Sequence, residues 1–251
     1  MAGHSKWSNI KHRKSKEDAR RGQLFTKLAR QITIAAREGG GDPQSNFRLR
    51  LAVEKARASN MPNDNIDRAI KRGTGELEGD RLEEIIYEGY GPAGMAVLLE
   101  ALTDNRNRTA SDLRHLFSKY GGNLGESGCV AWMFEKKGRL IINTEVTPVD
   151  EETVMLEAIE SGAEDIEVEE NYIEIITAPG DFQAVKESLE ASGYVFDDAE
   201  VTMIPTNTVE IPADKTEQAL KLLEALEELD DVQQVYANGD FDEEAIAAAG
   251  A

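Results

Sequence analysis

The order of strands and helices between residues 139 and 204 constrains the fold of this chain more than any other feature. Hydrophobic periodicity there predicts, in order, a strand at 139–143, a helix at 149–161, strands at 165–169 and 172–177, a helix at 181–192 and a strand at 200–204. This βαββαβ succession is typical of a ferredoxin-like domain. We therefore predict a complete domain at residues 135–205.

The segments on either side of this domain are each incomplete. The upstream segment predicts strands at 82–90, 95–102 and 129–134 around a helix at 106–120, and the downstream segment predicts a strand at 208–211, a helix at 214–228 and a strand at 232–237. Joining 76–134 to 206–240 completes both, which predicts a discontinuous second α/β domain with the third inserted into it. Residues 241–251 are acidic and then alanine-rich, so we expect a frayed tail.

Residues 1–75 predict a three-helix domain. A first helix ends near residue 38 at a glycine-rich turn, a second at 46–59 is expected to bury Phe47, Leu51, Val53 and Ala56, and a third at 64–72 is capped by Asn63. The turn at 60–63 is compatible with a DNA-binding helix-turn-helix and equally with ordinary three-helix packing. The predicted fold class is α+β: an N-terminal three-helix domain followed by two ferredoxin-like α/β domains.

Charge is distributed very unevenly along the 251 residues, whose net charge is -20. Residues 1–75 hold 17 Lys/Arg and 7 Asp/Glu, a net of +10, and the remainder holds 11 and 41, a net of -30. Such an asymmetry indicates one part that faces nucleic acid and another that repels it. The alternative is a solubilising acidic body with a basic tail.

The basic character is strongest in the first twenty-one residues, where Lys and Arg alternate with two histidines and a tryptophan. Cationic side chains suit phosphate contacts, and aromatic rings suit base stacking. Residues 1–16 lack periodicity and are expected to form an extended or mobile arm. The candidate nucleic-acid contacts are His4, Lys6, Trp7, Lys11, His12, Arg13, Lys14, Lys16, Arg20, Arg21, Lys27 and Arg30.

Two further polar stretches are candidates. The start of the helix at 106–120 carries Asp104, Asn105, Arg106 and Arg108, a possible second contact, because a helix N-terminus with arginines can hold phosphate or carboxylate. Simple helix capping with surface arginines explains the same residues. The segment 87–92 could be a stacking or docking surface, or only a tight hairpin turn.

Enzymatic and metal-binding motifs are not found. The sequence has no phosphate-binding Gly-rich loop ending in Lys-Ser/Thr, and residues 125–128 miss the nucleophile-elbow pattern by one position. Cys129 lies in a predicted apolar strand, which favours a buried structural cysteine, and His115 has no evident acidic partner. We expect no catalytic residues, no metal and no cofactor. The single cysteine and the lack of a signal or membrane span predict a cytoplasmic protein with no membrane partner.

Several motifs together resemble the YebC/PmpR family, whose eukaryotic relatives include the translational activator of mitochondrial cytochrome oxidase subunit one. The matching stretches are GHSKW at 3–7, GGGDP at 39–43, MP at 61–62, RAI at 68–70, YEGYGP at 87–92, DNRNRT at 104–109, GGNLG at 121–125, AEVTMIP at 199–205 and DVQ through Tyr236 at 231–236. The resemblance implies a basic helical domain, two α/β domains with the third inserted in the second, and a cytoplasmic, non-enzymatic role in gene expression.

The resemblance implies two alternative modes of action. Members of the family are generally described as DNA-binding transcriptional regulators, and they are also described as translation factors that relieve ribosome stalling at proline-rich stretches. The expected partners are therefore DNA or ribosomal or transfer RNA, with the ribosome or RNA polymerase as the larger assembly. The acidic remainder favours an arm that enters an RNA crevice over a body that lies along a duplex. An enzyme is the third and least favoured class, because the catalytic motifs are missing.

Overall fold

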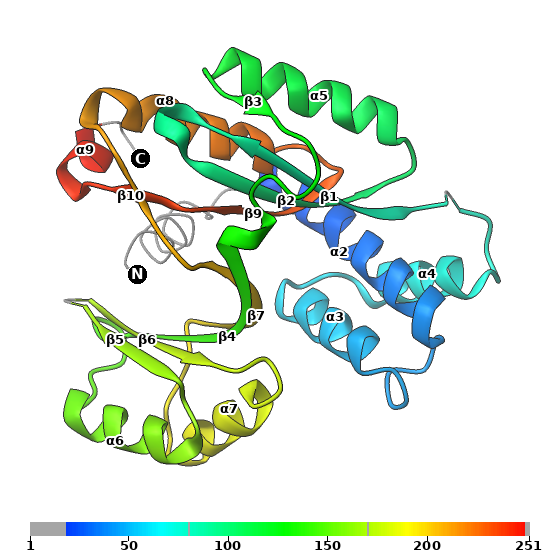
Figure 1. Ribbon diagram of the computed structural model, residues 1–251. Coiled ribbons are helices and arrows are strands. Elements are labelled where there is room, and N and C mark those ends of the chain that lie inside the picture. Colours follow the sequence, from blue (N-terminus) through cyan, green and yellow to red (C-terminus); the bar gives the residue numbers. More distant parts are fainter. Residues whose placement is uncertain (1–18, 80, 170, 249–251) are drawn as a thin grey trace. The chain divides into compact units, whose positions relative to one another are not determined.

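The computed structural model describes residues 19–79, 81–169 and 171–248. They form two compact units (Figure 1). The described part of the inserted unit is residues 132–207, and that of the main unit is residues 19–131 together with 208–248. The main unit is thus built from two stretches of chain, with the inserted unit between them in sequence, as predicted.

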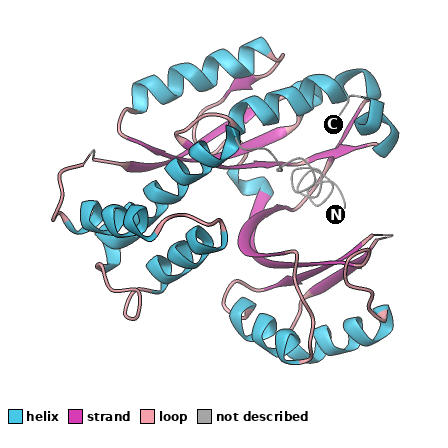
Figure 2. Cartoon of the chain, turned by 180° about the vertical axis from the view of Figure 1, so that it is seen from behind, coloured by secondary structure: helices cyan, strands magenta, loops and turns pink. Residues whose placement is uncertain are grey.

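The inserted unit is a two-layer α/β domain. Its elements are β4 (Phe134–Asn143), α6 (Glu151–Ser161), β5 (Asp165–Val168), β6 (Tyr172–Thr177), α7 (Phe182–Ala191) and β7 (Asp198–Pro205). The strands form an antiparallel sheet in the order β5-β6-β4-β7. Both helices lie on one side of the sheet (Figure 1 and, from behind, Figure 2). There Leu140 and Ile175 pack against Val154 and Val185. The predicted ferredoxin-like arrangement is confirmed.

One strand prediction in this region is wrong. Residues 129–134 were expected to form a strand, but they form a turn and a short 3-10 helix, η2 (Ala131–Met133), and β4 begins only at Phe134. The physical reason is a side chain: the carboxylate of Glu88 accepts the backbone N–H groups of Val130 and Ala131, so these donors do not enter a strand ladder. Periodicity cannot reveal such competition from a distant residue.

The α/β part of the main unit also has two layers. Its elements are β1 (Glu83–Tyr90), the 3-10 turn η1 (Pro92–Gly94), β2 (Ala96–Thr103), α5 (Arg106–Lys119), β3 (Asn123–Leu124), β8 (Val209–Ile211), α8 (Ala213–Glu227) and β9 (Val232–Ala237). The sheet order β3-β1-β2-β9 joins the two stretches of chain, because β9 pairs antiparallel with β2. Helices α5 and α8 share one apolar core with this sheet, which includes Phe117, Leu99 and Leu223.

The end of the described chain is packed, so the prediction of a frayed tail from residue 241 is wrong for its described residues. Strand β10 (Gly239–Phe241) pairs in parallel with β8, which therefore does not extend the four-stranded sheet. Helix α9 (Glu243–Ala248) follows. Phe241 and Ile246 are 1% and 7% exposed and belong to the core of α5 and α8. The sequence signal for this packing was the presence of two apolar residues, Phe241 and Ile246, in an acidic and alanine-rich tail.

The helical part of the main unit consists of α2 (Ala19–Gly39), α3 (Phe47–Ala58) and α4 (Asn63–Thr74). Its core joins Leu28 and Ile32 of α2 to Leu49 of α3 and Ile66 of α4. Helices α2 and α4 approach closely at Gly73, where an added Cβ would lie 2.4 Å from the carbonyl oxygen of Thr33. A larger residue at 73 would force the two helices apart.

Two details of the helical prediction are wrong. Phe47 and Leu51 were expected to be buried but are 52% and 40% exposed, because α3 turns Leu49, Val53 and Ala56 toward the core instead. The helix is apolar on both sides, so its sequence does not decide which side packs. Asn63 was expected to cap α4, but it is the first helical residue, and Pro62 holds the N-cap position without a side-chain hydrogen bond.

The predicted α+β class is confirmed, whereas the boundary at residues 75/76 stays a prediction because the helical and α/β parts form one compact unit. Among the described helices, none combines the length and the hydropathy that a membrane crossing requires.

Candidate nucleic-acid interface

The predicted arm residues cannot be placed. His4, Lys6, Trp7, Lys11, His12, Arg13, Lys14 and Lys16 lie outside the described residues. The backbone of Arg20 and Arg21 belongs to α2, and their side chains are likewise outside the described part. Their assignment as nucleic-acid contacts stays a prediction.

Helix α2 uses polar side chains to dock on the C-terminal end of α8. Lys27 Nζ donates to the carbonyl oxygen of Glu227 at 2.6 Å, and Gln23 Nε2 donates to that of Glu228. Carbonyl groups at a helix C-terminus lack partners within the helix and carry partial negative charge, so cationic and polar donors stabilise them. Lys27 therefore contributes to packing, and its predicted contact with nucleic acid is untested by this geometry.

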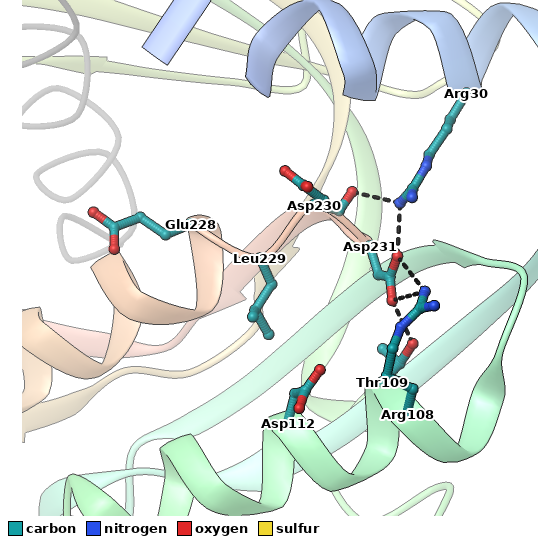
Figure 3. Close-up of a pocket in the computed structure, with 8 residues that line it drawn as sticks. All are labelled: Arg30, Arg108, Thr109, Asp112, Glu228, Leu229, Asp230 and Asp231. Carbon is teal, nitrogen blue, oxygen red and sulfur yellow. Dashed lines mark hydrogen bonds and ion pairs between the residues drawn. The ribbon is translucent and has the colours of Figure 1, made fainter. Parts of the chain in front are cut away.

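Arg30 of α2 occupies a comparable position. Its Nη1 atom donates to Asp231 Oδ1 at 2.8 Å and to the carbonyl oxygen of Asp230 at 2.7 Å (Figure 3). The same atom donates to the carbonyl oxygen of Leu102 at 3.1 Å. Its side chain is 20% exposed. These bonds hold the basic helix against the start of β9, so Arg30 has a structural role that its sequence position did not reveal, and a role toward nucleic acid remains a prediction.

Asp231 is the centre of this contact, and we call Arg30, Thr103, Arg108, Thr109 and Asp231 the Asp231 cluster. Oδ2 accepts from Thr109 Oγ1 at 2.7 Å, from Arg108 Nη2 at 3.0 Å and from Thr103 Oγ1 at 3.3 Å. Burial alone would raise the pKa of Asp231, but the hydrogen bonds from Thr109, Arg108 and Arg30 outweigh it and lower the pKa. The aspartate is therefore ionised at neutral pH and joins α2, α5, β2 and β9.

The second predicted contact, at the start of α5, belongs largely to this cluster. Asn105 caps α5 by accepting from the backbone N–H of Arg108 at 3.1 Å, and Arg108 Nη2 donates to Asp104 at 2.6 Å as well as to Asp231. Arg106 is exposed, and its carbonyl oxygen accepts from Tyr87 Oη at 3.2 Å. The capping explanation accounts for Asp104, Asn105 and Arg108, while a nucleic-acid contact by these four residues stays a prediction.

A pocket of about 450 Å³ lies beside the Asp231 cluster (Figure 3). It is lined by Arg30, Arg108, Thr109, Asp112, Glu228, Leu229, Asp230 and Asp231. Two arginines face four carboxylates, and both arginines already bind Asp231, so the pocket is unsuited to phosphate. Within the described ranges there is no group of three or more His, Cys, Asp or Glu side chains that could hold a metal ion.

Glu88 anchors a loop, a role that the sequence did not single out within segment 87–92. It is 3% exposed, and its carboxylate accepts the backbone N–H groups of Gly128, Val130 and Ala131 at 2.5, 2.7 and 2.7 Å. Tyr90 Oη donates to the carbonyl oxygen of Cys129 at 3.0 Å on the same loop. The segment therefore fixes the loop that leads into the inserted unit, which favours a structural role for the hairpin.

Replacing Glu88 with Gln is expected to reduce stability at neutral pH by about 1–2 kcal/mol, because three charge-assisted hydrogen bonds lose their charge. Burial would raise the pKa of Glu88, but the three N–H donors lower it below its ordinary value. The ionised group thus contributes stability that is present above that ordinary value and is lost as the pH falls through the lower folded-state pKa. Urea unfolding at neutral and acidic pH checks this: the variant should show a weaker acid dependence, and an unchanged one would contradict it.

Several described basic residues of α3 and α4 face outward. Arg50, Arg57, Arg68, Lys71 and Arg72 are all exposed, and Arg68 also donates to Asn65 Oδ1 at 3.1 Å. The sequence interpretation concentrated on the arm and missed these positions. The available signal was helical spacing, because residues 50 and 57, like 68 and 72, recur on one side of a helix.

These features define a class of protein in which a basic helical part is joined to the α/β part of the same compact unit through an internal ion-pair cluster. Residues 5–76 match the family profile described as TACO1/YebC protein N-terminal domain, and residues 82–239 match that described as TACO1/YebC second and third domain. The chain belongs to the TACO1/YebC family, which confirms the resemblance noted from the sequence.

Similar proteins cover almost the whole chain. A probable transcriptional regulatory protein of Halothermothrix orenii is 57% identical over 245 residues, 97% of each chain. One from Natranaerobius thermophilus is 58% identical over 244 residues, 97% of this chain and 98% of the relative. The crystal structure of a conserved hypothetical protein, Aq1575, from Aquifex aeolicus matches with a TM-score of 0.82 and 52% identity, covering 93% of this chain and 96% of that one. The relatives' names support a regulatory role for the family.

Proposed function

We propose that this protein is a regulator of gene expression that binds nucleic acid through its N-terminal residues 1–75. The observation that carries the proposal is the segregation of charge, with a net of +10 in these residues and -30 in the rest. A basic surface attracts the phosphate backbone and releases its counterions, whereas an acidic body opposes close contact along a duplex. Within the described part of these residues, α3 and α4 carry exposed arginines and lysines.

The proposed role is non-catalytic and cytoplasmic. Cys129 is the one thiol in the sequence, and burial followed by the charge of Glu88 raises its pKa, whereas a nucleophilic cysteine needs a lowered pKa. His115 is exposed on α5. These properties support a binding protein rather than an enzyme, and a turnover assay in which Cys129→Ser abolishes activity would refute this part of the proposal.

DNA is the first candidate target, because close relatives are named probable transcriptional regulatory proteins. RNA on the translating ribosome is the second. It is favoured by the outward side of α3, where Phe47 and Leu51 are exposed beside Arg50 and Arg57, because apolar side chains do not read the hydrogen-bonding edges of base pairs in a major groove. Both candidate targets would bind the same basic residues, and they differ in whether the bound partner is DNA or RNA on the ribosome.

One experiment separates the two targets. The full chain is mixed with a mixture of duplex DNA fragments and, separately, with purified ribosomes at the same ionic strength, and binding is measured by gel shift and by co-sedimentation. Tighter binding to DNA supports a transcriptional role, and tighter binding to ribosomes supports a translational one. Failure to bind either would refute the proposed function.

A further inference from the structure

Helix α3 has an outward face that is both apolar and basic. Phe47 and Leu51 lie one helical turn apart and are 52% and 40% exposed. Arg50 and Arg57, two turns apart, lie together on one side of these two residues and are exposed. The opposite face of α3, with Leu49, Val53 and Ala56, packs in the core of the helical part. The outer apolar residues are therefore not needed to hold the helix in place.

Phe47 is also held in a fixed position. Asn46, 6% exposed, caps α3 by accepting from the N–H of Leu49 at 3.1 Å and donates to the carbonyl oxygens of Ala35 and Gly40 at 2.7 and 2.8 Å. Gly39 permits this, because a Cβ there would lie 2.6 Å from Asn46 Nδ2. The glycine-rich segment 39–43 thus anchors the first turn of α3. An exposed aromatic ring on a rigid cap loses little entropy when it binds a partner.

The aromatic ring of Phe47 contacts a cationic side chain. The guanidinium carbon of Arg50 lies 5.3 Å from the centroid of the Phe47 ring, within the range of a cation–π contact. An aromatic ring beside an arginine is a platform on which an unpaired base can stack, and nearby cations can bind the phosphates on either side of that base. Around this platform α3 carries four basic residues and one acidic residue, Glu54. Glu38 and Glu84, which lie outside the helix, both pair with Arg48, so the balance of charge still favours an anionic partner.

We propose that the outer face of α3, formed by Phe47, Arg50, Leu51 and Arg57, binds an unpaired nucleotide of RNA. The base stacks on the face of the Phe47 ring opposite Arg50. Arg57, about 15 Å along the helix from Phe47, contacts a phosphate further along the strand. RNA is the partner because its folded forms present many unpaired, accessible bases, whereas the bases of duplex DNA are paired and stacked. This inference rests on the proposed function and deepens it by naming a second contact surface besides the arm.

The test measures the affinity of the full chain for a single-stranded uridine oligonucleotide at several salt concentrations. Phe47→Ala is expected to weaken binding about 5- to 100-fold without changing the slope of affinity against salt, because it removes stacking and no phosphate contact. Phe47→Trp should retain the affinity. Arg57→Ala should reduce the slope by about 0.7, the value for one phosphate contact on a single strand.

Leu77→Ala is the matched control, because Leu77 is also an exposed apolar residue, at 41%, and lies outside α3. It should bind like the unmodified chain, and circular dichroism should show all variants folded. An unchanged affinity in Phe47→Ala would overturn the inference and assign the face to a protein partner. If an arm variant loses affinity while Phe47→Ala does not, the proposed function stands without this site. If the unmodified chain binds no nucleic acid, both fail.

Discussion

Replacing Lys11, Arg13 and Lys14 with alanine is expected to weaken nucleic-acid binding on the order of 100-fold at about 0.1 M salt. Each lysine or arginine that neutralises a phosphate releases a counterion, so three lost contacts remove a large part of the electrostatic free energy of binding. The three residues lie in the segment with the highest density of basic side chains. A filter-binding or fluorescence-anisotropy titration of the full-length variant measures the loss.

The matched control removes the same charge elsewhere. Lys119, Lys136 and Lys215 are exposed residues outside the N-terminal 75, and their replacement with alanine makes the chain equally more acidic. Binding by this control should fall by less than about 3-fold, because distant exposed charges are screened beyond about 10 Å at this salt. An equal loss in both variants would mean that net charge alone, and no localised interface, determines affinity.

Replacing Asp231 with alanine is expected to lower the free energy of unfolding of the main unit by about 3 kcal/mol. The change removes a carboxylate that is 8% exposed and leaves Arg30, Arg108 and Thr109 without their common acceptor. Urea unfolding followed by circular dichroism measures the effect. Asp230→Ala is the control, because the neighbouring side chain is exposed and should change stability by about 0.5 kcal/mol or less.

Asp231→Ala and Asp230→Ala also test how α2 is held against the start of β9. Because Arg30 of α2 donates to Asp231 at the start of β9, hydrogen exchange in α2 should accelerate in Asp231→Ala and stay unchanged in Asp230→Ala. Equal stability and equal exchange in the two variants would show that the Asp231 cluster contributes nothing to the docking of α2.

The α/β elements could be predicted because their local signals agree with their tertiary roles. The inserted unit alternates apolar residues at strand spacing, and Gly162 ends α6 in a left-handed conformation with φ of 106°, as its sequence position suggests. The need to complete two half-domains predicted that the two stretches of chain join, and the structure supplies the pairing of β9 with β2 that joins them. These inferences rest on patterns within short windows of sequence.

The remaining features depend on contacts between residues far apart in sequence. Glu88 replaces a strand ladder with side-chain hydrogen bonds to residues some forty positions away, and Arg30 meets Asp231 across about two hundred. Phe47 was wrongly predicted to be buried because α3 is apolar on two sides. Packing against α2 and α4 decides which of the two sides faces the core. The sequence analysis named Arg30 and Arg108 as candidate nucleic-acid contacts. Only the structure shows that both side chains bind Asp231.

The most direct test of the central proposal is the salt dependence of nucleic-acid binding by the unmodified chain. The logarithm of the association constant is plotted against the logarithm of the salt concentration, with duplex DNA and with ribosomal RNA. A basic N-terminal interface predicts a slope steeper than about -2.7 on the DNA, equivalent to three or more phosphate contacts, and a shallower slope in the Lys11/Arg13/Lys14 variant. A slope near zero, or the same slope in both proteins, would contradict the account.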